Sequence, residues 1–167
     1  CSVILDGKVI RSCTRKIARV KEYSRVITLE GIGSPANLHP LQVAWMNQGA
    51  VQCGFCAPGF IVSAYALLLE NDNPTRQEVR DWFQKHKNVC RCTGYKQLVD
   101  AVMDAARVVR GEASIEEITY TPPEDNECYG KPLVRPAALA KVTGLADYGE
   151  DMALKMPPET LHVAVVQ

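Results

Sequence analysis

The chain begins with a β-like pattern that gives way to a helical one. Two short apolar runs, residues 3–5 and 8–11, flank Asp6-Gly7, and a third apolar run covers residues 26–29. Asp-Gly between two apolar runs predicts a hairpin, because both turn positions need a positive φ. Glycines and a proline between positions 31 and 35 then interrupt the pattern, so the small β unit is expected to end there.

Beyond residue 37, apolar residues recur with a period near 3.6, which predicts four helices. Pro58 is expected to open the second helix, and the capping box from Thr75 to Glu78 the third. The fourth is expected to start at Thr93-Gly94 and to end at Gly111. Four amphipathic helices joined by short loops predict a compact bundle. The residues that mark the four helical faces are Leu38, Leu41, Trp45 and Gln48; Phe60, Ile61, Ala64, Leu67 and Leu68; Val79, Trp82 and Phe83; and Leu98, Val99, Val102, Met103 and Ala106.

Composition divides the 167 residues into four segments: a β unit (1–30), a helical domain (31–111), an acidic, proline-bearing linker (112–134) and a last segment (135–167). The last segment ends in an apolar run that predicts a strand, and it is too short to fold alone. We therefore expect it to be the start of another domain. The chain opens on Cys rather than Met and closes in strand-like sequence, so we expect an internal piece of a longer protein.

Charge and hydropathy exclude several classes of partner. The chain has 47% apolar residues and equal numbers, 19 each, of basic and acidic residues. A neutral chain favours neither nucleic acid nor a polybasic membrane anchor. No apolar run reaches the roughly 18 residues of a membrane span, and no signal-peptide pattern is present. The expected partners are other protein surfaces and a cofactor.

Seven cysteines are the main chemical signal. A disulfide framework would favour an even count in a shorter secreted chain. Instead, a C-x2-C pair, Cys53 and Cys56, and a C-x-C pair, Cys90 and Cys92, lie in the loops before the second and fourth helices. We expect these four thiolates to meet at one end of the bundle and to bind a metal or a cluster. Cys128, in the linker, is expected to be an incidental thiol.

Two metal centres fit four thiolates at this spacing. Helix N-termini suit a dianionic 2Fe-2S cluster, and hydrogen bonds to sulfur help to set its potential. A structural zinc ion would carry the same total charge, although zinc ribbons commonly use C-x2-C twice. The spacing therefore favours iron–sulfur and leaves open a non-redox zinc module that docks proteins. A thioredoxin-like C-x-x-C is weaker, since no βαβ pattern surrounds it.

The sequence from Gln52 to Gly59, QCGFCAPG, together with CRCTGY from Cys90 to Tyr95, resembles the second iron–sulfur domain of the xanthine oxidase family of molybdenum hydroxylases. Within that family, the likeness is greatest to the flavin-free aldehyde oxidoreductases of sulfate-reducing bacteria, and it covers essentially the whole chain. The resemblance implies a mainly α fold with a small β part. A four-helix 2Fe-2S domain would follow the end of a plant-type 2Fe-2S domain and precede the start of a molybdenum-binding domain.

By this resemblance, Cys53, Cys56, Cys90 and Cys92 hold the 2Fe-2S cluster of the helical domain. Gln52 and Cys92 match positions that contact the pterin, although an ordinary loop hydrogen bond is the alternative for Gln52. No catalytic residue falls within this chain. The other matched positions are Cys1 and Cys13, the third and fourth ligands of a plant-type cluster that is incomplete here; His39, His86 and His162 match no role and are expected at helix ends or on the surface.

The resemblance also implies a function. Flavin-containing relatives insert a flavin domain where this chain has a short linker, and the stretch from Lys141 to Gly144, with Asp147-Tyr148 after it, resembles the opening of the molybdenum domain. The enzyme is thus expected to oxidise aldehydes to carboxylic acids with a molybdopterin cytosine dinucleotide cofactor bound mainly outside this chain, and without FAD. Hydroxylation of a purine or another N-heterocycle is the alternative.

The same resemblance implies the partners of the complete enzyme. It is expected to be a cytoplasmic homodimer with no membrane span. Its electrons would leave through the plant-type cluster to an external acceptor such as a flavodoxin or a ferredoxin.

Overall fold

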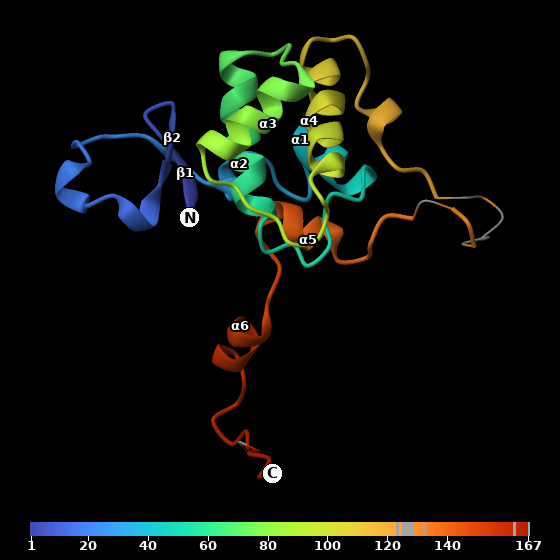
Figure 1. Ribbon diagram of the computed structural model, residues 1–167. Helices are drawn as coiled ribbons and strands as arrows, with labels where there is room; N and C mark the ends of the chain where they lie inside the picture. The colour runs from blue at the N-terminus through green and yellow to red at the C-terminus, as the bar shows by residue number, and fades with distance from the viewer. Residues whose placement is uncertain (123, 125–128, 132, 162, 167) are drawn as a thin grey trace.

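The computed structural model describes every residue except 123, 125–128, 132, 162 and 167 (Figure 1). Its regular elements are the strands β1 (Ser2–Leu5), β2 (Lys8–Arg11) and β3 (Val26–Ile27), the helices α1 (Pro40–Asn47), α2 (Ala57–Glu70), α3 (Arg76–Lys85), α4 (Lys96–Val109), α5 (Ala138–Thr143) and α6 (Gly149–Leu154), and four short 3-10 turns. The fold is mainly helical with a small antiparallel sheet, as predicted. Within the described residues, no helix is long and apolar enough to cross a membrane.

The hairpin at the start of the chain is confirmed. Asp6 and Gly7 both adopt a positive φ, 48° and 81°, between β1 and β2. β1 also pairs with β3, so the strand order is β2-β1-β3. The Asp6 carboxylate accepts hydrogen bonds from the Ser24 hydroxyl and the Arg25 N–H, at 2.9 and 2.8 Å. These bonds tie the end of the long connection back to the turn.

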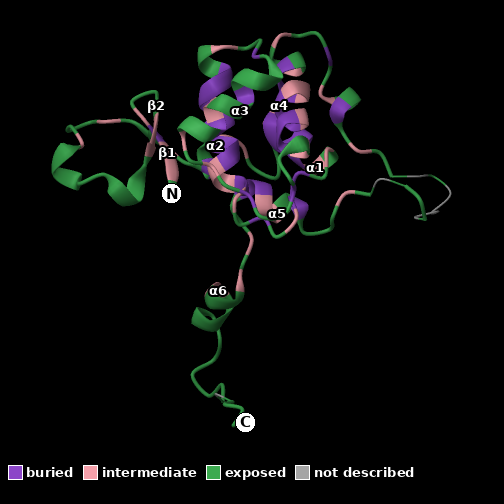
Figure 2. Ribbon diagram, viewed as in Figure 1, coloured by how far each residue is buried: buried purple, intermediate pink, exposed green. Residues whose placement is uncertain are grey.

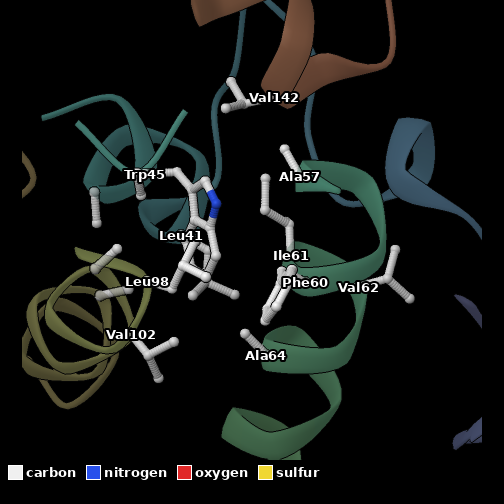
Figure 3. Close-up of a cluster of buried hydrophobic side chains, with 14 of the residues drawn as sticks. Leu41, Trp45, Ala57, Phe60, Ile61, Val62, Ala64, Leu98, Val102 and Val142 are labelled. Atoms are coloured by element: carbon white, nitrogen blue, oxygen red, sulfur yellow. The ribbon is translucent and has the colours of Figure 1, made fainter. Parts of the chain in front are cut away.

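Helices α1 to α4 enclose the apolar core, in which Trp45, Phe60 and Leu98 are at most 1% exposed (Figure 3). Ile4, from β1, is buried in the same core, because β1 packs against α2. The sheet and the helices therefore share one hydrophobic core.

Two helix starts differ from the prediction. α2 begins at Ala57, so Pro58 takes the second helical position rather than the first. α4 begins at Lys96, because Gly94 and Tyr95 have φ values of 66° and 71°, which a right-handed helix cannot accommodate. The capping box of α3 is confirmed, since the Thr75 and Glu78 side chains bond reciprocally to each other's backbone N–H.

α1 is buried beyond the face that the sequence pattern marked. Five successive residues, 41–45, are buried, because α5 packs against α1 in addition to the other helices. Val142 of α5 is fully buried beside Ala57 (Figure 3). The buried Gln42 side chain donates to the carbonyl oxygens of Gly33 and Val142, at 3.1 and 2.9 Å.

The segment after α5 extends away from the helices and is largely exposed (Figure 2). The strand expected at the end of the chain is absent from the described residues between 160 and 166. No neighbouring strand in the described part of the chain pairs with this run. α5 itself packs with the helical core, while the division of the chain into four segments stays a prediction.

Candidate metal centre

The two cysteine loops lie against each other. Cys53 and Cys56 are on the loop between α1 and α2, and Cys90 and Cys92 on the loop between α3 and α4. The sulfur atoms of Cys53 and Cys92 are 3.5 Å apart. The Cys56 thiol hydrogen-bonds to Cys90. The structure thus brings together the four cysteines that the sequence singled out, arranged as two pairs.

The two pairs differ in exposure. Cys90 is buried and Cys56 is partly buried, whereas Cys53 and Cys92 are exposed. The centre therefore has an inner pair against the core and an outer pair at the surface. A redox group held by all four would be shielded from water on one side and open on the other.

Hydrogen bonds converge on the inner cysteine. The Cys90 sulfur accepts from the Thr93 hydroxyl at 3.3 Å and from the Cys92 N–H at 3.4 Å. The Cys90 N–H donates to the phenol oxygen of Tyr95 at 3.1 Å. Burial alone would raise the pKa of the Cys90 thiol, but hydrogen bonds from Thr93, Cys92 and Cys56 lower it overall. These hydrogen bonds stabilise the Cys90 thiolate independently of a bound metal.

Cys56 behaves in the opposite way. Burial, followed by the neighbouring sulfurs of Cys90 and Cys53, raises the pKa of the Cys56 thiol to about 12. Cys56 therefore keeps its proton near neutral pH and donates it toward Cys90. Since thiolates are the metal-binding form, metal binding would release this proton.

One of the two cysteine pairs has the spacing of two ligands on one metal. Two thiolates on one tetrahedral metal with bonds of about 2.3 Å lie about 3.8 Å apart. The pair of Cys53 and Cys92 is close to that separation. In the part of the chain that the structure describes, no three His, Cys, Asp or Glu side chains converge closely enough to hold one metal ion.

The loop of Cys53 and Cys56 is held by residues from the end of the chain, which the sequence reasoning missed. The Lys141 ammonium donates to the carbonyl oxygen of Gln52 at 2.8 Å, and the Tyr148 hydroxyl donates to that of Cys53 at 3.1 Å. Both residues lie in the stretch that resembles the opening of a molybdenum domain. That stretch was the available signal, but it did not indicate which loop they contact.

The other predicted residues lie apart from this centre. Cys1 and Cys13 are exposed at the ends of the hairpin, where the Ser12 N–H donates to the Cys1 carbonyl oxygen at 2.8 Å. His39 and His86 take the N-cap of α1 and the C-cap of α3, as expected of helix-end histidines. Two further predictions, for Cys128 and His162, lie outside the described residues.

Comparisons with known proteins agree with this centre. The family model of the 2Fe-2S binding domain matches residues 28–103. The chain is 38% identical over 110 residues to one subunit of the nicotinate dehydrogenase of Pseudomonas putida, covering 66% of this chain and 68% of its relative. The chain belongs to the xanthine oxidase family of molybdenum hydroxylases. The match to a 2Fe-2S binding domain favours the iron–sulfur alternative over the zinc module that the cysteine spacing had left open.

Within this family, the chain is similar over its full length to one part of larger enzymes. It is 58% identical over 167 residues to the aldehyde oxidoreductase of Megalodesulfovibrio gigas, all of this chain and 18% of that protein. The crystal structure of the aldehyde oxidoreductase from Desulfovibrio desulfuricans matches with a TM-score of 0.90 and 63% identity, over 98% of this chain and 18% of that one. The chain thus spans less than a fifth of these two molybdenum hydroxylases.

Proposed function

We propose that this chain is the electron-transfer segment of a molybdenum-containing aldehyde oxidoreductase, with Cys53, Cys56, Cys90 and Cys92 as the ligands of a 2Fe-2S cluster. The observation that carries the proposal is the pair of facing cysteine loops, in a chain 58% identical throughout to an aldehyde oxidoreductase. A 2Fe-2S cluster supplies one-electron transfer at a potential that its surroundings set. The nicotinate dehydrogenase of Pseudomonas putida is less similar, at 38% identity, so hydroxylation of an N-heterocycle is the second candidate.

The chain's own residues would orient the cluster. The buried Cys90, with the Thr93 hydroxyl on its sulfur, would form the water-shielded side. Cys53 and Cys92 would form the open side, facing the rest of the enzyme. We place the pterin of a molybdopterin cytosine dinucleotide on that open side, in contact with Gln52 and Cys92. The exposure of Cys92 and the position of Gln52 directly before the outer cysteine support this placement.

A plant-type cluster bound beside the sheet would carry electrons away from the helical domain. We propose Cys1 and Cys13 as two ligands of the plant-type cluster, since both are exposed at the end of the hairpin. With α4 and α5 joined by a short linker, no flavin domain would lie between them, and electrons would pass to an external flavodoxin or ferredoxin. The complete enzyme would be cytoplasmic, since free thiolates need a reducing compartment during cluster insertion. We also propose that it is a homodimer, as the family resemblance implies.

Spectroscopy of the complete enzyme tests the ligand assignment. After dithionite reduction, we expect two 2Fe-2S signals by electron paramagnetic resonance (EPR). Cys92→Ser should abolish or distort the signal of the helical-domain cluster and reduce aldehyde turnover together, because it removes a ligand on the open side. Cys13→Ser is the matched control, and it should affect the other signal.

Two outcomes would contradict the proposal. One is a colourless, EPR-silent protein with stoichiometric zinc. The other is an intact helical-domain signal with normal turnover in the Cys92→Ser enzyme. Turnover of a purine or a nicotinate in place of aldehydes would leave the electron-transfer role and select the second candidate.

A further inference from the structure

α5 is seated firmly beside the cysteine loops. Its Ala138 and Val142 side chains are 2% and 0% exposed, and the helix packs against both α1 and α2. The Gln42 side chain, itself fully buried, donates to the Val142 carbonyl oxygen and fixes the C-terminal end of α5. Lys141, the residue before Val142, therefore extends from a firmly packed helix.

Lys141 lies along the loop that carries Cys53. Besides the bond of its ammonium to the Gln52 carbonyl oxygen, its aliphatic stem covers Gly54. A Cβ atom at Gly54 would be 2.4 Å from Cδ of Lys141 and 2.6 Å from Cγ. Gly54 also has a φ of 86°, which glycine adopts without strain. Any other residue at position 54 would therefore strain the backbone and displace the Lys141 side chain.

Tyr148 holds the next part of the same loop. Its hydroxyl donates to the Cys53 carbonyl oxygen, and its ring meets the Phe55 ring edge to face, with centroids 5.9 Å apart. Phe55 is otherwise 80% exposed. Two successive carbonyl groups, of Gln52 and Cys53, are therefore occupied by side chains from beyond the linker.

From these contacts we infer that Lys141 and Tyr148 are positioning residues, which hold the Cys53 side of the centre at its distance from Cys92, and that the Lys141 charge raises the cluster's reduction potential. The inference rests on the proposed function. The Sγ separation of 3.5 Å joins two loops that are 39 residues apart in sequence, so it depends on how each loop is held. The loop of Cys90 and Cys92 has its own support in Thr93 and Tyr95. The opposite loop takes its support from Lys141 and Tyr148.

The electrostatic part follows from charge. Reduction adds one negative charge to a cluster that is already anionic, so a nearby cation stabilises the reduced form. The Lys141 ammonium binds a neutral carbonyl oxygen, which leaves its full charge facing the loop. The Tyr148 hydroxyl is neutral and can position the loop without this effect.

Two variants of the complete enzyme separate positioning from charge. Lys141→Met keeps most of the stem over Gly54 and removes the charge and the hydrogen bond. It should shift the one-electron equilibrium of the helical-domain cluster about threefold toward the oxidised form, about 30 mV in a redox titration followed by EPR. It should also speed iron loss to a ferrous chelator by about tenfold, because a hydrogen bond from a charged donor opposes local opening. Tyr148→Phe should speed iron loss by about threefold at an unchanged potential.

Conservative and distant variants serve as controls. Lys141→Arg keeps the charge and should restore the wild-type potential. Lys155→Met removes an exposed lysine that pairs with Asp147 in the same segment, and it should change neither measurement. Wild-type potential and wild-type iron loss in both Lys141→Met and Tyr148→Phe would overturn the inference. A wild-type enzyme with no 2Fe-2S signal would instead overturn the proposed function.

Discussion

At the scale of single residues, Thr93 shows how the cysteine loop is tuned. The Thr93 side chain is buried, and its hydroxyl donates to the Cys90 sulfur while it accepts the Tyr95 N–H at 3.3 Å. The spacing of the cysteines was enough to predict that the four thiols meet. The role of Thr93 was not predictable, because it depends on the local fold of the loop: the left-handed residues Gly94 and Tyr95 turn the Tyr95 N–H back to the Thr93 hydroxyl.

Removing the Thr93 hydroxyl should lower the cluster's reduction potential. A hydrogen bond to a ligand sulfur favours the more negative reduced state, so Thr93→Val is expected to shift the one-electron equilibrium about threefold to tenfold toward the oxidised form, about 30–60 mV. A redox titration of the EPR signal measures the shift. Ser63→Ala removes another buried hydroxyl, one that contacts Trp82 rather than a cysteine, and should leave the potential unchanged. An unaltered potential in Thr93→Val would refute this role.

At the scale of elements, the sequence predicted helices better than helix ends. The capping box of α3 was readable because Thr and Glu are common capping residues. The cap of α1 was not, because His39 serves there: its Nδ1 accepts the Leu41 N–H at 3.1 Å, while Gln42 accepts the His39 N–H at 2.9 Å. The His39 ring also meets the Tyr65 ring edge to face, with centroids 5.1 Å apart.

This cap should make the chain less stable in mild acid. Burial lowers the pKa of His39 from 6.5 to about 4, so the folded state resists a proton that the unfolded state accepts. Stability is therefore full above pH 6.5 and decreases as the pH falls toward 4. Between pH 7 and pH 5 the loss should be about 1–2 kcal/mol, allowing for the partial exposure of the ring.

His39→Asn isolates that effect, because Asn caps helices well and does not titrate. The measurement is the difference in unfolding free energy between the two chains at pH 7 and at pH 5, by urea denaturation. The shifted pKa of His86 is common to both chains and cancels. Equal pH dependence in the two chains would show that His39 is not the titrating cap.

At the scale of the whole molecule, charge is unevenly distributed although the chain is neutral. Residues 8–25 contain seven Lys and Arg and a single acidic residue, Glu22. Arg11, Arg15 and Arg19 line one hollow of about 320 Å³ beside the hairpin. The sequence prediction rested on the net charge of the whole chain, which is zero, and so missed this local excess, although residues 8–25 are contiguous in the sequence. The packing of α5 with the helical core was also missed, because the sequence prediction assigned the apolar residues of α5 to the following domain.

The basic surface formed by Arg11, Arg15 and Arg19 predicts how the proposed acceptor, an acidic electron carrier, would bind. Reversing Arg11, Arg15 and Arg19 to Glu in the complete enzyme should raise the KM for an acidic flavodoxin by at least about tenfold and weaken its dependence on salt. Reduction of an uncharged quinone should be unchanged. Arg107→Glu, at an exposed position of α4, a helix that lies away from the sheet (Figure 1), is the matched control. An unchanged KM and salt dependence would exclude this surface as the docking site.

The hydrogen bond from Tyr148 to the Cys53 carbonyl oxygen also has a consequence for the order of events during synthesis. The two residues are 95 positions apart. At the usual rate of translation, about 5–20 residues per second, the loop of Cys53 is made roughly 5–19 seconds before Tyr148. During that interval Cys53 has been made but Tyr148 does not yet hold its loop. A cluster delivered early would meet a loop that Tyr148 does not yet hold, so we expect stable insertion only after residue 148 has been made.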